Sequence, residues 1–188
     1  MNFAAYLFMG IPAGIMISKM GYKKTVLVGL TLGFIGVCVQ FLSSRTGAET
    51  AIFGGLMNLN YFIYLLGAFI CGFAVCVLNT VVNPMLNLLG GGGNRGNQYV
   101  QIGGSLNSLA GTLTPMLAGM LIGEVTKQTS MTDVAPLLYI AMGVFAASIV
   151  IIGFTPLVEP EQEGGDTMAL IKGALGYKHL IFGVIAIF

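Results

Sequence analysis

The sequence predicts an all-α polytopic membrane protein, and two features of its composition carry this prediction. Of the 188 residues, 56% are hydrophobic and 8% are charged, whereas soluble globular domains contain about 25% charged residues. The charges are also unevenly placed, because the 45 residues between Glu49 and Arg95 include none. A helix that spans a bilayer needs about 20 apolar residues. The apolar runs are continuous and lack the alternation of a transmembrane β-barrel, so helices are expected.

Five apolar stretches and the start of a sixth are separated by charged or turn residues, and each full stretch is expected to contain a membrane helix. Because the third stretch is too long for one perpendicular span, its helix is placed at about Asn60–Leu89, with Phe53–Asn58 as an interfacial lead-in. The five stretches are about Asn2–Ser18, Thr25–Ser44, Ile52–Leu89, Tyr99–Gly123 and Val134–Leu157, and the sixth begins near His179.

Glycines recur within these stretches at spacings that let helix backbones approach closely. We interpret the pattern as close packing within a bundle of helices. The pairs spaced by four are Gly10/Gly14, Gly29/Gly33 and Gly119/Gly123, and the fourth stretch also contains Gly103, Gly104 and Gly111.

The positive charges predict how the helices are oriented. Six Lys or Arg residues fall in the first, third and fifth loops, and two, Arg45 and Lys127, fall in the second and fourth. Loops rich in Lys and Arg stay in the cytoplasm, so the odd-numbered loops are expected on that side. In the fifth loop, Met168–Tyr177 is predicted to form a short amphipathic helix on the cytoplasmic face. The 10 residues His179–Phe188 are too few to cross a core of roughly 30 Å, so we expect the chain to be part of a longer one.

The composition argues against other classes of function. A net charge of +1 provides no electrostatic footprint for nucleic acid. The three cysteines lie inside apolar runs without C-x-x-C spacing and are interpreted as packing residues. Gly91, Gly93 and Gly96 match G-x-G-x-x-G, but a membrane helix precedes them, so a turn is favoured over a nucleotide site. We therefore expect no enzyme activity, no cofactor and no metal site.

A polar stripe interrupts the third stretch. Asn79, Asn83 and Asn87 are spaced by four residues and therefore lie on one helix face. Such a stripe normally faces the bundle interior or a water-filled cavity, and amides can exchange hydrogen bonds with hydroxyl groups. The alternative is that these side chains hold helices together, at about 1 kcal/mol each; we favour lining for Asn79 and Asn83, and less so for Asn87. Pro84 removes one backbone hydrogen bond and is expected to allow a kink.

The fourth stretch offers two further candidates for contacting a substrate. Asn107 shares a helix face with Gly103 and Gly111, whereas Gln101 lies about 120° away around the helix. We expect the two side chains not to contact one ligand together. Asn107 is the preferred candidate, and Gln101 is the second.

The first loop is a short glycine-containing turn with three cations between two helices. It reads Gly14-x-x-x-Ser18-Lys19-x-Gly21-x-Lys23-Lys24. This run resembles the loop between the second and third helices of the major facilitator superfamily, Gly-x-x-x-Asp-Arg-x-Gly-Arg-Arg/Lys. Ser18 stands where the family has the acid that latches its two halves together. The resemblance implies a conformational role at the cytoplasmic side for Gly14, Lys19, Gly21, Lys23 and Lys24.

A second pattern is more specific and comprises Leu78-Asn79-Thr80-Val81-Val82-Asn83-Pro84, Leu88-Leu89-Gly90, Gln101 and Asn107-Ser108-Leu109-Ala110-Gly111. It resembles the fourth and fifth helices of the fucose:proton symporter branch of this superfamily, and especially its glucose/galactose transporters. The resemblance implies part of the N-terminal six-helix half of a major facilitator fold. Residues 1–157 would be helices 2 to 6, residues 158–178 the cytoplasmic loop between halves with its short amphipathic helix, and residues 179–188 the start of helix 7.

The same resemblance implies secondary active transport of a hexose, of glucose/galactose or fucose type, by alternating access in the bacterial cytoplasmic (inner) membrane. Asn79 departs from the fucose-specific members, which carry a carboxylate there. None of the predicted spans has Asp, Glu, Lys, Arg or His in its interior, so the coupling cation is left as a proton or sodium. The expected partners are the sugar, this cation and the lipid bilayer, with no nucleic acid. The alternative is a non-transporting membrane remnant or an assembly partner, because five spans do not form two rocking halves.

Overall fold

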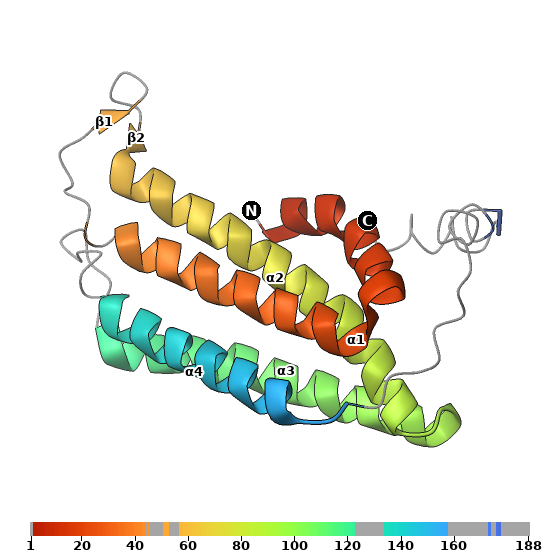
Figure 1. The fold of residues 1–188 in the computed structure, drawn as a ribbon. Coiled ribbons are helices and arrows are strands. Elements are labelled where there is room, and N and C mark those ends of the chain that lie inside the picture. Colours follow the sequence, from red (N-terminus) through yellow and green to blue (C-terminus); the bar gives the residue numbers. More distant parts are fainter. Residues whose placement is uncertain are drawn as a thin grey trace. The chain divides into compact units, whose positions relative to one another are not determined.

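The computed structural model describes residues 2–43, 45, 51–52, 57–122, 134–157, 173 and 176–177. The chain divides into two compact units, Met1–Val158 and Glu159–Phe188, and each is described by itself. The helices of the first unit are long and apolar enough to cross a membrane, as the composition predicts. They are α1 (Asn2–Ser43), α2 (Leu59–Leu89), α3 (Gly93–Ile122) and α4 (Ala135–Phe154) (Figure 1).

α1 contains the first two predicted stretches, joined at Gly21. This residue alone departs from helical geometry within α1, with φ 81° and ψ 172°. That combination is open almost exclusively to glycine. The Thr25 hydroxyl donates a buried hydrogen bond of 2.6 Å to the Gly21 carbonyl oxygen and so stabilises the start of the second arm, residues 22–43. The predicted turn between the two stretches is thus a single glycine rather than a loop of several residues.

A short hairpin precedes α2. β1 (Ala51–Ile52) pairs antiparallel with β2 (Met57–Asn58), and Ala51 lies opposite Asn58. The predicted lead-in therefore ends in a strand, and its residues 53–56 lie outside the described residues. α2 begins one residue before the predicted Asn60 and ends at the predicted Leu89.

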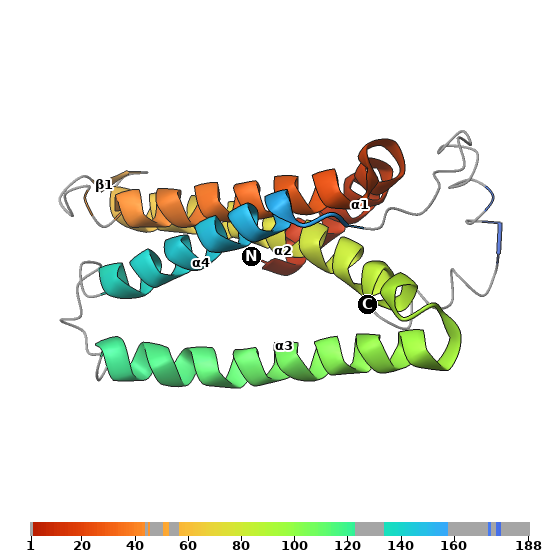
Figure 2. The same cartoon turned by 60° about the horizontal axis from the view of Figure 1, so that its bottom comes forward.

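The tightest packing in the first unit joins α1 to α2, which run side by side (Figures 1 and 2). A Cβ at Gly36 would lie 2.6 Å from Cys71 Sγ, and one at Gly29 would lie 3.2 Å from Leu78 Cγ. The close packing predicted for Gly29 is therefore confirmed. The core cluster beside these contacts consists of Val26, Leu30 and Val81, with Ile17, Tyr22, Leu78, Phe145, Ile149 and Ile152 packed against it.

α4 packs along the second arm of α1. Midway, a Cβ at Gly33 would lie 2.7 Å from Cζ of Phe145, which confirms the close packing predicted there. Near the end of α1, the Phe41 and Tyr139 rings have centroids 4.8 Å apart. The Arg45 guanidinium carbon lies 5.6 Å from the Phe41 ring centroid, at the distance of a cation–π contact.

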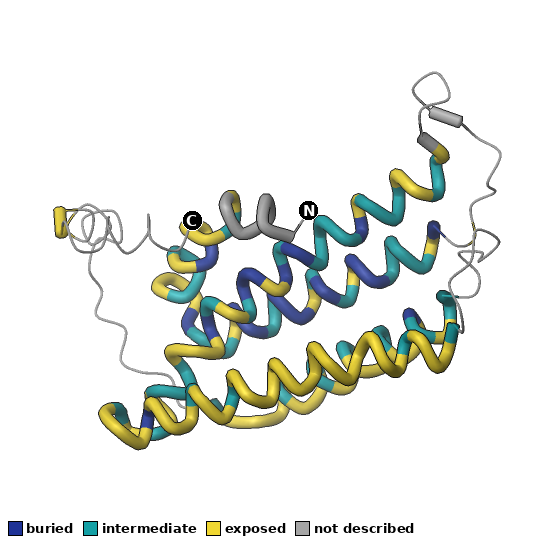
Figure 3. The backbone as a smooth tube through the Cα atoms, turned by 180° about the vertical axis from the view of Figure 1, so that it is seen from behind, coloured by how far each residue is buried: buried dark blue, intermediate teal, exposed yellow. Residues whose placement is uncertain are grey.

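α3 is the least covered helix. Among its residues Gly96 alone is buried, and Figure 3 shows exposed residues along most of its length. A Cβ at Gly104, Gly111 or Gly119 would meet nothing within 4 Å, and the same holds for Gly10 and Gly14 of α1. The close packing predicted for these glycines is not found among the described residues, because small residues permit a close approach only where a partner helix is present.

The second unit has three described residues. The Gly176 N–H donates to the Gly173 carbonyl oxygen at 3.1 Å, and Tyr177 is exposed. The rest of the predicted amphipathic helix Met168–Tyr177, and the predicted helix start His179–Phe188, lie outside the described residues.

Candidate functional site

Asn79 and Asn83 lie on the side of α2 that points away from α1. On the opposite side, against α1, Val77 and Val81 are fully buried. A step of two residues turns a helix by about 200°, so the two asparagines point away from this packed face, and both are exposed. They form a strip of amides, here called the amide strip, on a face of α2 that α1 leaves uncovered.

The backbone beside the amide strip lacks one helical hydrogen-bond donor. α2 stays helical through Pro84, but proline has no N–H, so the Thr80 carbonyl oxygen lacks its helical donor. The Thr80 hydroxyl donates to the Cys76 carbonyl oxygen, 2.8 Å away. The Thr80 carbonyl, which follows Asn79 directly in the chain, therefore lacks its usual helical hydrogen bond. The kink at Pro84 stays a prediction.

Asn87 has a different environment from the amide strip. Its carbonyl oxygen accepts a hydrogen bond of 3.0 Å from the Gly92 N–H in the turn after α2. A Cβ at Gly96 would lie 2.7 Å from that same oxygen and 3.0 Å from Asn87 Cγ. Asn87 thus packs against the start of α3, which favours a structural role at the turn.

The G-x-G-x-x-G pattern forms this turn between α2 and α3 (Figure 2). Gly91, Gly92 and Gly93 have φ values of 74°, 72° and 59°. Glycine alone adopts such angles without steric cost, and Gly96 is required by its contact with Asn87. The prediction of a turn is confirmed, and the pattern is accounted for by the reversal of the chain.

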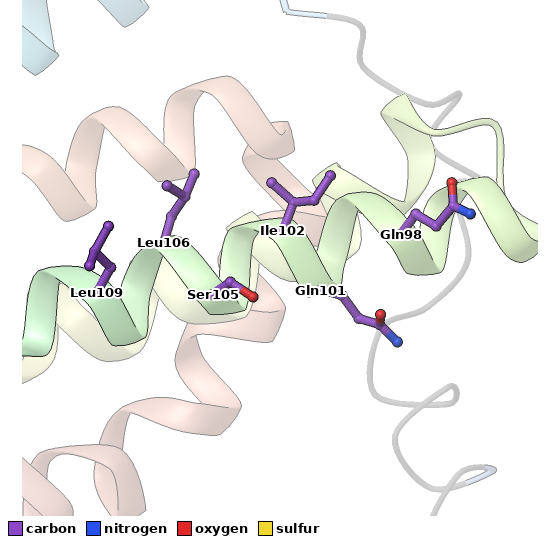
Figure 4. A pocket seen from close by; sticks show the side chains of 6 residues that line it. All are labelled: Gln98, Gln101, Ile102, Ser105, Leu106 and Leu109. Atoms are coloured by element: carbon purple, nitrogen blue, oxygen red, sulfur yellow. The ribbon is translucent and has the colours of Figure 1, made fainter.

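Gln101 lines an open groove of about 470 Å³ that runs along α3. Figure 4 shows Ile102, Leu106 and Leu109 on one side of the helix and Gln101 on the other. The polar members follow each other at spacings of three and four, so they form a stripe beside the apolar ones. The lining residues, all from α3, are Gln98, Gln101, Ile102, Ser105, Leu106 and Leu109.

Asn107 does not line this groove. It lies on the side of α3 toward α2, because one turn earlier a Cβ at Gly103 would lie 2.6 Å from Leu86 Cδ1. α2 and α3 run in opposite senses from their turn, so Asn83 and Asn107 each lie about one helical turn beyond this contact. Helical spacing thus puts the exposed Asn107 about one turn beyond the Gly103–Leu86 contact, and Gln101 on another face of α3.

In the first loop, Lys23 makes a contact that links distant parts of the chain. Its Nζ donates a hydrogen bond of 2.9 Å to the Thr155 carbonyl oxygen at the end of α4. The break at Gly21 lies two residues before it. These two predicted loop residues therefore lie at a junction between α1 and α4.

The remaining predicted loop residues are Gly14, Lys19 and Lys24. Lys19 and Lys24 are exposed, and a Cβ at Gly14 would meet nothing within 4 Å. Ser18, at the position of the family's acid, donates its hydroxyl to the Ile15 carbonyl oxygen one turn earlier, at 3.0 Å. That hydroxyl bond stays within its own helix.

The described helices contain no Asp, Glu or His. Within the part of the chain that the structure describes, no three potential metal ligands among His, Cys, Asp and Glu cluster together. Apart from Arg95 near the start of α3, the polar groups of α2 and α3 are therefore amides, hydroxyls, thiols and backbone carbonyls. Such groups suit a neutral, hydroxyl-rich ligand.

The sequence matches the Major Facilitator Superfamily over residues 1–187. The chain belongs to this superfamily. It is accordingly a multi-pass membrane protein of a transporter family, and not an enzyme.

Several curated members of the superfamily are similar to this chain, two of them along almost its whole length. A glucose/galactose transporter of Brucella abortus is 25% identical over 191 residues, covering 99% of this chain and 43% of that protein. A putative glucose/galactose transporter of Helicobacter pylori is 30% identical over 201 residues, covering 99% and 44%. The L-fucose-proton symporter of Escherichia coli is 29% identical over 85 residues, covering 45% and 17%. The chain thus spans less than half the length of these relatives.

A solved structure has the same fold. The crystal structure of the Escherichia coli fucose:proton symporter superposes with a TM-score of 0.70 at 17% identity, covering 98% of this chain and 49% of that one. The all-α prediction and the assignment to half of a major facilitator fold are therefore confirmed.

Sequence reasoning did not single out Gln98 and Ser105, which line the groove with Gln101. The sequence does contain a pattern that could have identified them, because polar residues recur at spacings of three and four over successive turns of this helix.

Proposed function

We propose that the chain forms one half of a secondary active transporter that carries a hexose across the bacterial cytoplasmic membrane by alternating access. The observation that supports this proposal most strongly is the match to the superfamily over residues 1–187 together with similarity to glucose/galactose transporters along 99% of the chain. The second half would be supplied by sequence equivalent to the rest of these relatives.

In this proposal the amide strip and Asn107 bind the sugar. A sugar hydroxyl both donates and accepts hydrogen bonds, and each amide offers two donors and one acceptor oxygen. Asn83 and Asn107 come from two different helices at about the same level, so together they can hold a ligand between α2 and α3. Gln101 would offer its amide to a ligand in the groove, which lies on a separate face of α3.

The coupling cation is proposed to be a proton or sodium. The described helices contain no Asp, Glu or His, so they offer no acidic side chain for a proton. Asn79 is a neutral amide where the resemblance to the fucose-specific members implies a carboxylate, and α2 contains no Asp, Glu or His that could accept a proton. If protons drive transport, their acceptor lies in sequence beyond the described helices. Sodium held by neutral oxygens, including those of the amide strip, is the second candidate.

Sugar binding is tested by thermal stabilisation of the purified protein, expressed from the reading frame that encodes these residues, read to its natural start and stop. A ligand at 100 times its Kd stabilises the folded state by about 2.7 kcal/mol. D-glucose, D-galactose or L-fucose is expected to raise the unfolding temperature, while mannitol, a matched polyol, leaves it unchanged. Equal shifts with mannitol and all three sugars would contradict a specific site.

The alternative is a non-transporting remnant or an assembly partner, because a single half of this fold does not alternate access. If natural start and stop codons bound these 188 codons, this alternative replaces the transport proposal.

A further inference from the structure

Lys23 places a positive charge at the C-terminal end of α4. α4 has no basic residue in its last turn. The carbonyl end of a helix carries partial negative charge, which a cation stabilises. Lys23 Nζ lies 2.9 Å from the Thr155 carbonyl oxygen, and the two residues are 132 positions apart.

The geometry of Thr155 leaves its carbonyl oxygen available for this contact. Its N–H and its hydroxyl both donate to the Ile151 carbonyl oxygen, at 3.0 and 2.7 Å. Thr155 is the C-cap of α4 with φ −77° and ψ 125°, so the chain leaves the helix at this residue. The contact is therefore made at the point where the chain departs from α4.

The position of Lys23 is set by the break in α1. The Gly21 backbone and the 2.6 Å bond from the Thr25 hydroxyl to its carbonyl hold the first turn of the second arm. Lys23 lies within that turn and is partly covered, whereas Lys19 and Lys24 are exposed. Among these three lysines, Lys23 is thus the one that reaches α4.

We propose that Lys23 is a positioning residue that ties the carbonyl end of α4 to the break in α1, so that α4 and the second arm of α1 move as one body. The Phe41–Tyr139 ring contact holds the same two segments at their other end. The role in transport rests on the proposed function, but the tether itself is a property of the fold. A neutral side chain at position 23 would release the end of α4.

The tether is tested by a distance between two spin labels at Lys24→Cys and Phe154→Cys, two exposed positions beside the contact. A charged thiosulfonate label is used, because Cys38, Cys71 and Cys76 lie in apolar segments away from water. The parent and the Lys23→Arg variant are expected to give one narrow distance distribution, and Lys23→Gln a broad one. Lys19→Gln, which removes an equal charge, is the control and should match the parent.

Two results would overturn the tether: an unchanged distribution in Lys23→Gln, or equal broadening in Lys19→Gln. If Lys23→Gln fails to insert, Lys23→Met, which keeps most of the aliphatic stem, takes its place. The expected effect on transport is about a fivefold lower Vmax with an unchanged KM, restored by Lys23→Arg. A parent protein without any uptake would refute the proposed function while the distance measurement still decided the tether. A raised KM with an unchanged Vmax would refute the positioning role.

Discussion

Gly36 and Gly67 bring the backbones of α1 and α2 into direct contact. A Cβ on Gly36 would lie 3.0 Å from the Gly67 carbonyl oxygen, and a Cβ on Gly67 would lie 2.8 Å from the Gly36 carbonyl oxygen. Backbone atoms cannot move aside as a flexible side chain does. Helices in a membrane lack a hydrophobic force between them, so van der Waals contact of this kind carries much of their association.

Alanine at either position should therefore force α1 and α2 apart. Gly36→Ala and Gly67→Ala are each expected to lower the stability of the folded state by about 1–3 kcal/mol, the usual cost of overpacking. Thermal unfolding in detergent measures the change. Gly143→Ala is the matched control, because a Cβ there would meet nothing within 4 Å. A loss of stability in Gly143→Ala, without one in Gly36→Ala or Gly67→Ala, would contradict this packing.

The break at Gly21 makes a separate prediction. Its φ of 81° and ψ of 172° lie in a region essentially confined to glycine, and other residues pay about 1–3 kcal/mol to occupy it. Gly21→Ala is expected to destabilise the protein by this amount, as measured by unfolding in detergent. Gly119→Ala, in an open helical position of α3, should be neutral or stabilising. Equal effects at both sites would refute strain at the break.

The positions of the helices could be predicted from the sequence because charge and hydropathy determine which segments enter a membrane. The predicted helix Asn60–Leu89 differs from α2 by one residue. The break was predictable as a turn, since glycine and lysines interrupt the apolar run. Its reduction to Gly21 alone was not, because it depends on the Thr25 bond and on packing around it.

The partners of individual residues were harder to predict. Gly29 and Gly119 have similar spacing in the sequence, but a Cβ on Gly29 would lie 3.2 Å from Leu78, while one on Gly119 would meet no described residue within 4 Å. Spacing shows which residues share a face, and the fold decides what lies opposite. The same limit applies to the candidate site: Asn79 and Asn87 share a stripe, but only the structure shows that Asn87 packs on Gly96.

Asn83 and Asn87 have different surroundings, so mutations at the two positions are expected to have different effects. Asn83→Leu is expected to raise the KM for the sugar by about tenfold, which corresponds to the loss of one hydrogen bond. Asn87→Leu should instead lower thermal stability, because its side chain packs against Gly96. Uptake kinetics and unfolding of both variants make the comparison. The reverse pattern would assign packing to Asn83 and binding to Asn87.

Pro84 makes a prediction about motion. Pro84→Ala supplies the missing N–H to the Thr80 carbonyl oxygen and should raise stability by about 1 kcal/mol. If a kink at Pro84 serves transport, the same variant is expected to have a lower Vmax. Pro115→Ala in α3 also restores one helical hydrogen bond and serves as the control. An equal fall in Vmax in both variants would show that position 84 has no special role.

The most direct test of the central claim is hexose uptake by the protein expressed from the complete reading frame and reconstituted in proteoliposomes. Labelled D-glucose, D-galactose and L-fucose are supplied under an imposed proton gradient or an imposed sodium gradient, with an ionophore as the control. We expect saturable uptake of at least one sugar, driven by one of the two gradients and abolished when that gradient is collapsed. Folded protein that shows no saturable uptake of any of the three sugars under either gradient would contradict the proposed hexose transport.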